Sequence, residues 1–144
     1  MQKKYKIGYT SGVFDMFHVG NLNILRKAKE QCELLVVGVS TDEVVESYKH
    51  KLPIIPFQDR LAIVQAIRYV DEVIPQDTMD KMEMWNEVHF DVMFHGDEWK
   101  GTSLYNKYEE EFAKVGVKIE YLSHTEGISS TILRDRLNNQ HKDE

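Results

Sequence analysis

The sequence has few of the residues that would indicate redox, zinc or membrane chemistry: one cysteine, three prolines and no long hydrophobic run. A single cysteine, Cys32, cannot form an internal disulfide or a zinc cluster, so we expect a buried and inert thiol. The apolar run at residues 34–39 is too short to cross a bilayer, and the basic start is not followed by the hydrophobic segment of a signal peptide. We therefore expect a cytoplasmic protein with no membrane partner.

Positive charge is also scarce, because 18 lysines and arginines face 24 acidic residues and the formal net charge is −6. A nucleic-acid-binding surface needs a basic face to neutralise phosphates, so we expect no nucleic-acid partner. A small anionic ligand needs only a local cluster, and Lys49, His50 and Lys51 provide a candidate. A short basic run can equally be a solvated surface, and both interpretations stay open at this point.

The order of apolar and polar segments predicts the fold. At 144 residues the chain can form one domain that buries roughly two thirds of its unfolded surface. Segments with strand character alternate with segments of helical period, and this alternation predicts an α/β fold with a Rossmann-like, doubly wound parallel sheet. The domain is expected to span residues 1–137, followed by a polar and frayed C-terminal tail at residues 138–144. Its ligand should bind beyond the carboxyl ends of the strands, near the switch point.

The expected elements follow from periodicity and from the turn residues between them. We predict strands at residues 6–11, 34–40, 72–74, 92–95 and 118–122, the third of them stopped by Pro75. We predict helices at residues 17–31, 42–48, 58–69, 80–88, 104–115 and 129–137, the last of them capped by Ser129 or Ser130.

The most informative segment is residues 12–21, which follows the first strand and leads into the first helix. The first turn of a helix has N–H groups without partners and a partial positive charge, so a glycine turn before it predicts a phosphate site. His18 and Asn21 lie three positions apart and could face the same anion. The segment resembles the GxFDxxHxGH signature of the cytidylyltransferase family, within the nucleotidyltransferase superfamily. Asn21 stands where this family has a second histidine.

Four further segments extend the resemblance over nearly the whole chain, in matching order and spacing. They are residues 40–43, 68–73, 96–99 and 125–131, and together they resemble the glycerol-3-phosphate cytidylyltransferases. Each is expected to follow a strand, so that one site can collect them. A dinucleotide-binding G-x-G-x-x-G and a Walker A lysine motif are both absent from the sequence. The resemblance implies CTP as substrate, Mg²⁺ that arrives with CTP and not in a protein metal site, and a homodimer with residues 68–73 near its two-fold axis.

The implied reaction moves CMP from CTP to a small phosphorylated alcohol, with glycerol 3-phosphate favoured. The attacking phosphate oxygen is already an anion, so catalysis consists of positioning and charge stabilisation. The resemblance implies that His18, Asn21 and Arg68 are catalytic. It implies that Lys49, Lys51 and Trp99 bind the acceptor. The residues that it implies for nucleotide binding are Gly12, Val13, Phe14, His18, Asn21, Arg68, Asp71, Asp97, His124, Thr125, Ser129 and Ser130.

Two positions depart from the family pattern. The amide of Asn21 can donate a hydrogen bond but cannot become cationic. His124 replaces an arginine, and it carries full charge only below a pKa of roughly 6.5 and cannot form a bidentate fork. Asn21 is compatible with a natural variant, an engineered substitution or a weakly active relative. The alternatives are therefore another acceptor such as phosphocholine, phosphoethanolamine or another polyol phosphate, another nucleotide such as ATP, or a nucleotide-binding protein without turnover.

Overall fold

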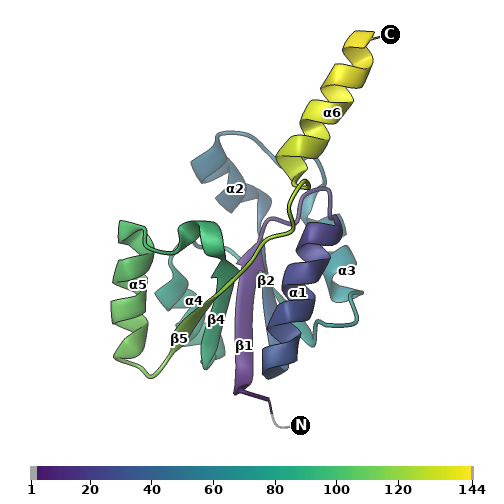
Figure 1. Cartoon of the computed structure of the whole chain (residues 1–144). Helices are drawn as coiled ribbons and strands as arrows, with labels where there is room; N and C mark the ends of the chain where they lie inside the picture. The colour runs from purple at the N-terminus through teal and green to yellow at the C-terminus, as the bar shows by residue number, and fades with distance from the viewer. Residues whose placement is uncertain (1–2, 144) are drawn as a thin grey trace.

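A computed structural model describes residues 3–143, and its centre is one five-stranded sheet in the order β3-β2-β1-β4-β5 (Figure 1). All neighbouring strands pair in parallel. This confirms the predicted Rossmann-like fold. The strands are β1 (Tyr5–Gly12), β2 (Cys32–Ser40), β3 (Glu72–Gln76), β4 (Val92–Gly96) and β5 (Lys118–Leu122).

Helices cover both faces of the sheet, which makes the fold doubly wound. On one face, α1 (Val19–Gln31) and α3 (Phe57–Gln65) add Leu25, Ala28 and Val64 to a core with β2 and β4. On the other face, α4 (Lys81–Val88) and α5 (Ser103–Ala113) add Met84 and Phe112 to a second core. The short helix α2 (Asp42–Lys49) follows the carboxyl end of β2 (Figure 1). The chain changes direction between β1 and β4, so the switch point lies at the carboxyl ends of these two strands.

Strand β2 shows why its sequence predicts a central strand. Leu35, Val37 and Val39 are buried in the first core, whereas Val36 is buried in the second. A strand covered on both faces must be apolar along its whole length, which is what residues 34–39 show. Cys32 begins this strand as a buried free thiol, as predicted.

Several boundaries differ from the predicted ones for local reasons. Helix α1 begins at Val19 and not at residue 17, because His18 is extended (φ −138°) and caps it. Strand β3 runs through Pro75 to Gln76, so the prediction that Pro75 stops it is wrong. Pro75 pairs with Val39, and an edge strand tolerates a proline because it needs ladder bonds on one side only. Helix α3 ends at Gln65, so residues 66–69 form turns and no further helical turn.

The last helix, α6 (Ser130–Asp143), is longer than predicted and projects from the body of the protein (Figure 1). Residues 138–143 are helical and not an irregular tail, because no glycine or proline follows Leu137 to end the helix. Glu144, the last residue of the predicted tail, lies outside the described residues. Within residues 3–143, no helix is both long and apolar enough to cross a membrane.

Candidate active site

A cleft of about 200 Å³ lies at the switch point, between the carboxyl ends of β1 and β4. Among the predicted nucleotide-binding residues, this cleft brings together Gly12, Val13, Phe14, Asn21 and His124. The turn after β1 is sharp, since Phe14 and Met16 both have positive φ (56° and 52°). Non-glycine residues adopt this conformation rarely, and such positions cluster at functional sites.

His18 and Asn21 form a reciprocal cap at the start of α1. His18 Nδ1 accepts a hydrogen bond from the Gly20 N–H at 3.1 Å, and Asn21 Oδ1 accepts one from the His18 N–H at 3.1 Å. Burial lowers the pKa of His18, so its ring is neutral at neutral pH. An acceptor role for Nδ1 leaves the proton on Nε2. Each side chain therefore uses one atom to fix the helix and keeps a donor, Nε2–H or Nδ2–H, for a ligand.

Gly20 allows the segment at residues 125–131 to pack against this cap. A Cβ at Gly20 would lie 2.9 Å from the His18 ring and 3.3 Å from Ile128 Cγ2. Asn23 adds a hydrogen bond from its Nδ2 to Thr125 Oγ1 at 2.7 Å. Two segments far apart in sequence thus meet at the start of α1, as the resemblance implies.

The predicted serines lie at the start of α6, next to the same turn. Ser129 Oγ accepts a hydrogen bond from the Ile132 N–H at 3.1 Å and caps the helix. Ser130 Oγ donates to the main-chain oxygen of Asp15 at 2.6 Å. Ser129 therefore caps α6, and Ser130 holds the helix beside the first motif.

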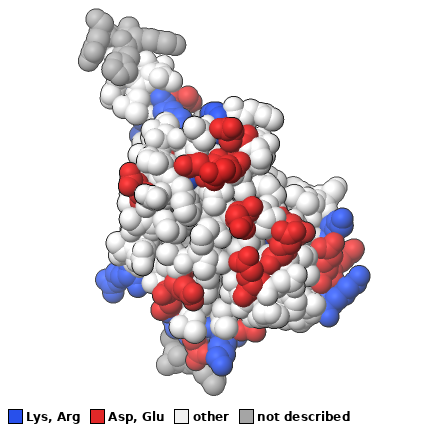
Figure 2. Space-filling view, turned by 180° about the vertical axis from the view of Figure 1, so that it is seen from behind, with Lys and Arg blue, Asp and Glu red and all other residues white. Residues whose placement is uncertain are grey.

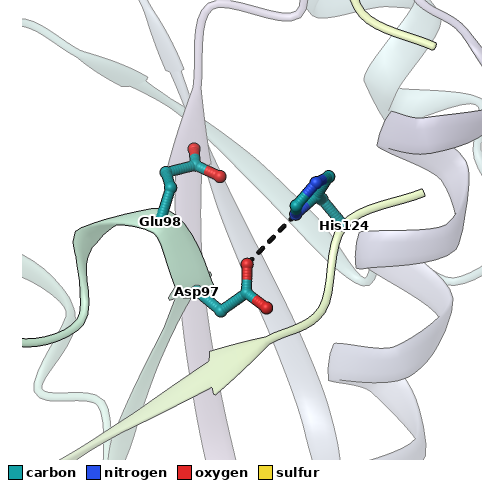
Figure 3. Close-up of side chains that lie close together, drawn as sticks. All are labelled: Asp97, Glu98 and His124. Carbon is teal, nitrogen blue, oxygen red and sulfur yellow. Dashed lines mark hydrogen bonds and ion pairs between the residues drawn. The ribbon is translucent and has the colours of Figure 1, made fainter. Parts of the chain in front are cut away.

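His124 lines the cleft, and Asp97 pairs with it beside that wall (Figure 3). Asp97 belongs to a short 3₁₀ turn, η1 (Asp97–Trp99), that was not predicted, and its Oδ1 lies 3.1 Å from His124 Nδ1. This hydrogen bond raises the pKa of His124, so the ring is more often cationic at neutral pH than a free histidine.

The same group can be tested as a metal site. Asp97, Glu98 and His124 each offer one ligand atom, and these atoms lie within 4.8 Å of one another (Figure 3). Mg²⁺ is usually held by one or two carboxylates and by the substrate's phosphates, so the two carboxylates fit it, whereas imidazole suits softer metals. All three side chains are exposed. Asp97 and His124 were predicted as nucleotide-binding residues, but their grouping with Glu98 was not, because His124 lies far from the acidic pair in the chain.

Lys49 is the last residue of α2, and Lys51 lies on the connection from α2 to α3, residues 50–56, which we call the lysine connection. Both side chains are exposed. Partial desolvation of the Lys49 ammonium, together with the nearby charges of Arg134 and Lys51, lowers the pKa of Lys49. Trp99, the third residue implied for the acceptor, is 40% exposed and packs edge-on against His95 with a centroid distance of 5.9 Å. His95 lines the cleft, so Trp99 lies beside it.

Asp15 was not predicted as a site residue, yet it joins three segments around the cleft. Its carboxylate is 4% exposed and accepts hydrogen bonds from the Ile54 and Ile55 N–H groups at 2.9 Å each. It also accepts one from Arg134 Nη2 on α6 at 2.8 Å. Burial alone would raise the pKa of Asp15, but these hydrogen bonds outweigh it and lower the pKa. The carboxylate therefore stays charged and fixes both the lysine connection and α6.

Arg60 is a second residue that sequence reasoning missed, and its side chain is fully buried. Its guanidinium donates to the carbonyl oxygens of Val13 (2.7 Å), Ser40 (2.7 Å) and Ile55 (2.8 Å), and to Asp42 Oδ1 (2.6 Å). The pattern predicted only an amphipathic helix here, in which an arginine is expected to be solvated. Arg60 instead joins the first motif, the end of β2 and the lysine connection.

Arg68 and Asp71 are not in the cleft. Asp71 precedes β3, and its Oδ2 contacts Lys29 Nζ at 2.6 Å and the Leu35 N–H at 2.7 Å. The Arg68 guanidinium is exposed and lies over the Tyr69 ring, 5.5 Å from its centroid. Parallel strands all begin at the same end of the sheet, and this end lies opposite the one at which the cleft is found. Within one chain the structure therefore does not place these two residues beside a nucleotide, because their segment leads into a strand and does not follow one.

Charge is unevenly distributed over the molecule. Figure 2 shows acidic side chains across the middle of the rear face and basic ones beside the base of the projecting helix. Lys49 lies close enough to Lys51, Arg134 and Asp15 for their charges to act on it, so a chain of net charge −6 still gathers cations beside the turn that follows β1. This arrangement suits a small polyanion.

A glycine turn that leads into a helix at the switch point of a doubly wound sheet is typical of one class, the nucleotide-binding α/β proteins. The chain belongs to the cytidylyltransferase-like family, whose model matches residues 9–136. It is 36% identical over 129 residues to a glycerol-3-phosphate cytidylyltransferase of Bacillus subtilis (strain 168), over 89% of this chain and 94% of that one. The resemblance found in the sequence is thereby confirmed.

Other relatives carry different names. An ethanolamine-phosphate cytidylyltransferase of Arabidopsis thaliana is 35% identical over 140 residues, which cover 90% of this chain but 31% of that protein. An FAD synthase of Thermococcus kodakarensis is 38% identical over 84% of this chain and 80% of its own. Among solved structures, a lipopolysaccharide core biosynthesis protein from Thermoplasma volcanium GSS1 matches with a TM-score of 0.70 and 26% identity, over 84% of this chain and 97% of that one.

Proposed function

We propose that this protein transfers CMP from CTP to a small phosphorylated alcohol, with glycerol 3-phosphate as the favoured acceptor, and releases pyrophosphate. The observation that carries the proposal is the cleft at the switch point, where the first motif turn, Asn21 and His124 meet. Membership of the cytidylyltransferase-like family supports the reaction class.

The chemistry requires little beyond positioning. A phosphate oxygen of the acceptor attacks the α-phosphorus of CTP, and the bond between the α-phosphorus and the bridging oxygen of pyrophosphate breaks. The attacking oxygen is already anionic, so the protein needs no strong base. It needs donors and cations that hold two polyanions together and stabilise the charge that develops on the oxygens.

The triphosphate is expected to lie against residues 12–14 and the first turn of α1. There it would meet backbone N–H groups, His18 Nε2–H and Asn21 Nδ2–H, with Thr125, Ser129 and Ser130 on the adjoining segment. His124, whose pKa is raised by the hydrogen bond to Asp97, would supply charge where the family has an arginine. This is the helix N-terminus geometry that favours phosphate.

The acceptor phosphate would be held by Lys49 and Lys51, which Asp15 and Arg60 keep near the first motif through Ile55. Trp99 would form part of the acceptor wall. When bound, Mg²⁺ would neutralise phosphate charge, and Asp97 and Glu98 are the carboxylates that could contact it.

We further infer a homodimer in the cytoplasm. The support for a dimer is the family resemblance together with the position of residues 68–73, which lie at the edge of the sheet opposite the cleft and leave the site open. Light scattering after size-exclusion chromatography tests the mass in solution.

The test of the function is direct. The protein is incubated with Mg²⁺, either CTP or ATP, and a panel of phosphorylated alcohols, and pyrophosphate and product masses are measured. We expect pyrophosphate and a CDP-alcohol with CTP. CTP should also stabilise the fold by about 2.7 kcal/mol at a hundredfold excess over its dissociation constant, and more than ATP does. Equal stabilisation by ATP would contradict the cytidine assignment.

A second candidate is a nucleotide-binding protein without turnover. It is favoured by Asn21, whose Oδ1 is engaged in the helix cap and whose side chain offers only a neutral donor. The same assay separates the two, because this candidate predicts stabilisation by CTP without pyrophosphate release.

A further inference from the structure

Lys81 is a partly buried cation without a carboxylate partner. It begins α4, and its Nζ donates to Ser11 Oγ at 2.9 Å. Among the described residues, no carboxylate lies within ion-pair distance of this ammonium. Burial lowers the pKa of Lys81 to about 8, so most of the side chain is still charged at neutral pH. A desolvated charge without a counter-charge is costly, and such groups are found where a ligand completes the site.

The position of Lys81 connects it to the cleft. Its partner Ser11 lies on β1 next to Gly12 and lines the cleft, as does His95 from β4. His95 Nδ1 accepts from the Gly96 N–H at 2.9 Å, which leaves the proton on Nε2. Because Nδ1 accepts this hydrogen bond, it carries no proton, and the ring is neutral. One wall of the cleft therefore carries a hydroxyl, a neutral imidazole and, behind the hydroxyl, an ammonium.

This wall lies beside Trp99, apart from the helix cap at His18 and Asn21 that is expected to hold the nucleotide's phosphates. We propose that Lys81, Ser11 and His95 form a subsite that binds the uncharged, hydroxyl-bearing end of the acceptor and selects against acceptors with a cationic end. The inference rests on the proposed function and narrows its substrate class to polyol phosphates. Hydroxyl oxygens can accept hydrogen bonds from the Ser11 hydroxyl, which Lys81 orients, and from His95 Nε2–H. A trimethylammonium group accepts none and meets the charge of Lys81, which has its own sign.

The central ring of the neighbouring aromatic cluster, Tyr105, offers no open face to a cation. It is 3% exposed and packs against His95, Trp99, Tyr108 and Tyr121. The Tyr121 ring already has a cation of the protein over it, since Lys100 Nζ lies 5.9 Å from its centroid. The charge of Lys81 then decides the preference of this wall.

The test compares Lys81→Met with Lys107→Met, which removes an exposed lysine of α5 as a matched control. For each protein, kcat/KM is measured by pyrophosphate release with CTP and either glycerol 3-phosphate or phosphocholine. The unchanged protein should favour glycerol 3-phosphate by about a hundredfold or more. Lys81→Met should lower kcat/KM for glycerol 3-phosphate by about 10- to 100-fold, mainly through the acceptor's KM, and should narrow the preference at least about tenfold. The KM for CTP should change less than about twofold, and Lys107→Met should behave like the unchanged protein.

A second variant separates charge from orientation. Ser11→Ala keeps the Lys81 ammonium but removes its hydrogen-bond partner. It should therefore lower kcat/KM for glycerol 3-phosphate, while kcat/KM for phosphocholine stays as low as in the unchanged protein. Ser11→Ala also tests the subsite if Lys81→Met does not fold, which the absence of a cooperative unfolding transition, with or without CTP, would reveal. An unchanged acceptor preference in Lys81→Met, or a preference of the unchanged protein for phosphocholine, overturns the subsite and leaves the proposed function standing. Absence of pyrophosphate with every acceptor overturns the proposed function and the subsite with it.

Discussion

Arg60→Met should destabilise the protein strongly, because it removes a buried guanidinium and leaves its partners without a donor. The change preserves much of the side chain's volume, but three carbonyl oxygens and the Asp42 carboxylate lose their hydrogen bonds. Breaking a buried ion pair by removing one partner costs about 3–5 kcal/mol. Unsatisfied carbonyls cost about 1–3 kcal/mol each, although water can reach some of them after the change. We expect a loss of about 4–6 kcal/mol, a large part of the 5–15 kcal/mol that is typical of a domain.

Urea unfolding, followed by circular dichroism, measures this loss. A matched double variant with Asp42→Asn removes the unpaired carboxylate, so it should recover part of the stability, about 1–2 kcal/mol. Arg26→Met is the control, because Arg26 is exposed and its ion pair with Glu30 on α1 contributes at most about 0.5 kcal/mol. A loss below about 1 kcal/mol for Arg60→Met would refute the reasoning, since the buried hydrogen bonds would then carry no net stability.

Three further outcomes follow from the cleft. Asn21→His should raise the single-turnover rate with saturating CTP by as much as ~10²–10³-fold, because a stronger donor to developing charge acts in the transition state; equal rates would show that the asparagine is a competent substitute. Asp97→Asn should lower the pKa of His124 toward its ordinary value, since it removes the hydrogen bond that favours the cation. An NMR titration of His124 in the variant measures this pKa. Because a deprotonated His124 has no charge to offer the triphosphate, the variant should also bind CTP more weakly at pH 8 than at pH 6. An unmoved pKa would contradict the pairing of Asp97 with His124. Neutralising Lys49 and Lys51 together should raise the KM of the acceptor far more than that of CTP, and unaltered acceptor kinetics would return both lysines to a solvated surface.

The fold could be predicted because its signals are local. The apolar run of β2 and the alternation of strands with helices depend on neighbours in sequence, and they indicated the parallel sheet. The errors arose where a boundary depends on topology or on a missing stop. Pro75 reads as a strand end until β3 is known to be an edge strand, and residues 138–143 continue α6 because no residue stops it.

The site was only partly predictable. Residues 12–21 form a contiguous motif, so the turn and the helix cap were visible in the sequence. Asp15, Arg60 and Lys81 were missed, because each owes its role to partners far away in the chain. The opposite error concerns Arg68 and Asp71, whose segment precedes a strand. Because this segment comes before β3 in the chain, it lies at the amino end of the sheet, whereas the cleft lies at the carboxyl end.

The hydrogen bonds of Asp15 couple the stability of residues 54–55 to that of α6. One carboxylate holds the Ile54 and Ile55 amides and Arg134 of α6, so detaching α6 also weakens the lysine connection. In terms of local unfolding, these two parts form one cooperative unit that can open while the sheet stays folded. Hydrogen exchange at Ile54 and Ile55 therefore reports whether a helix near the far end of the chain is attached.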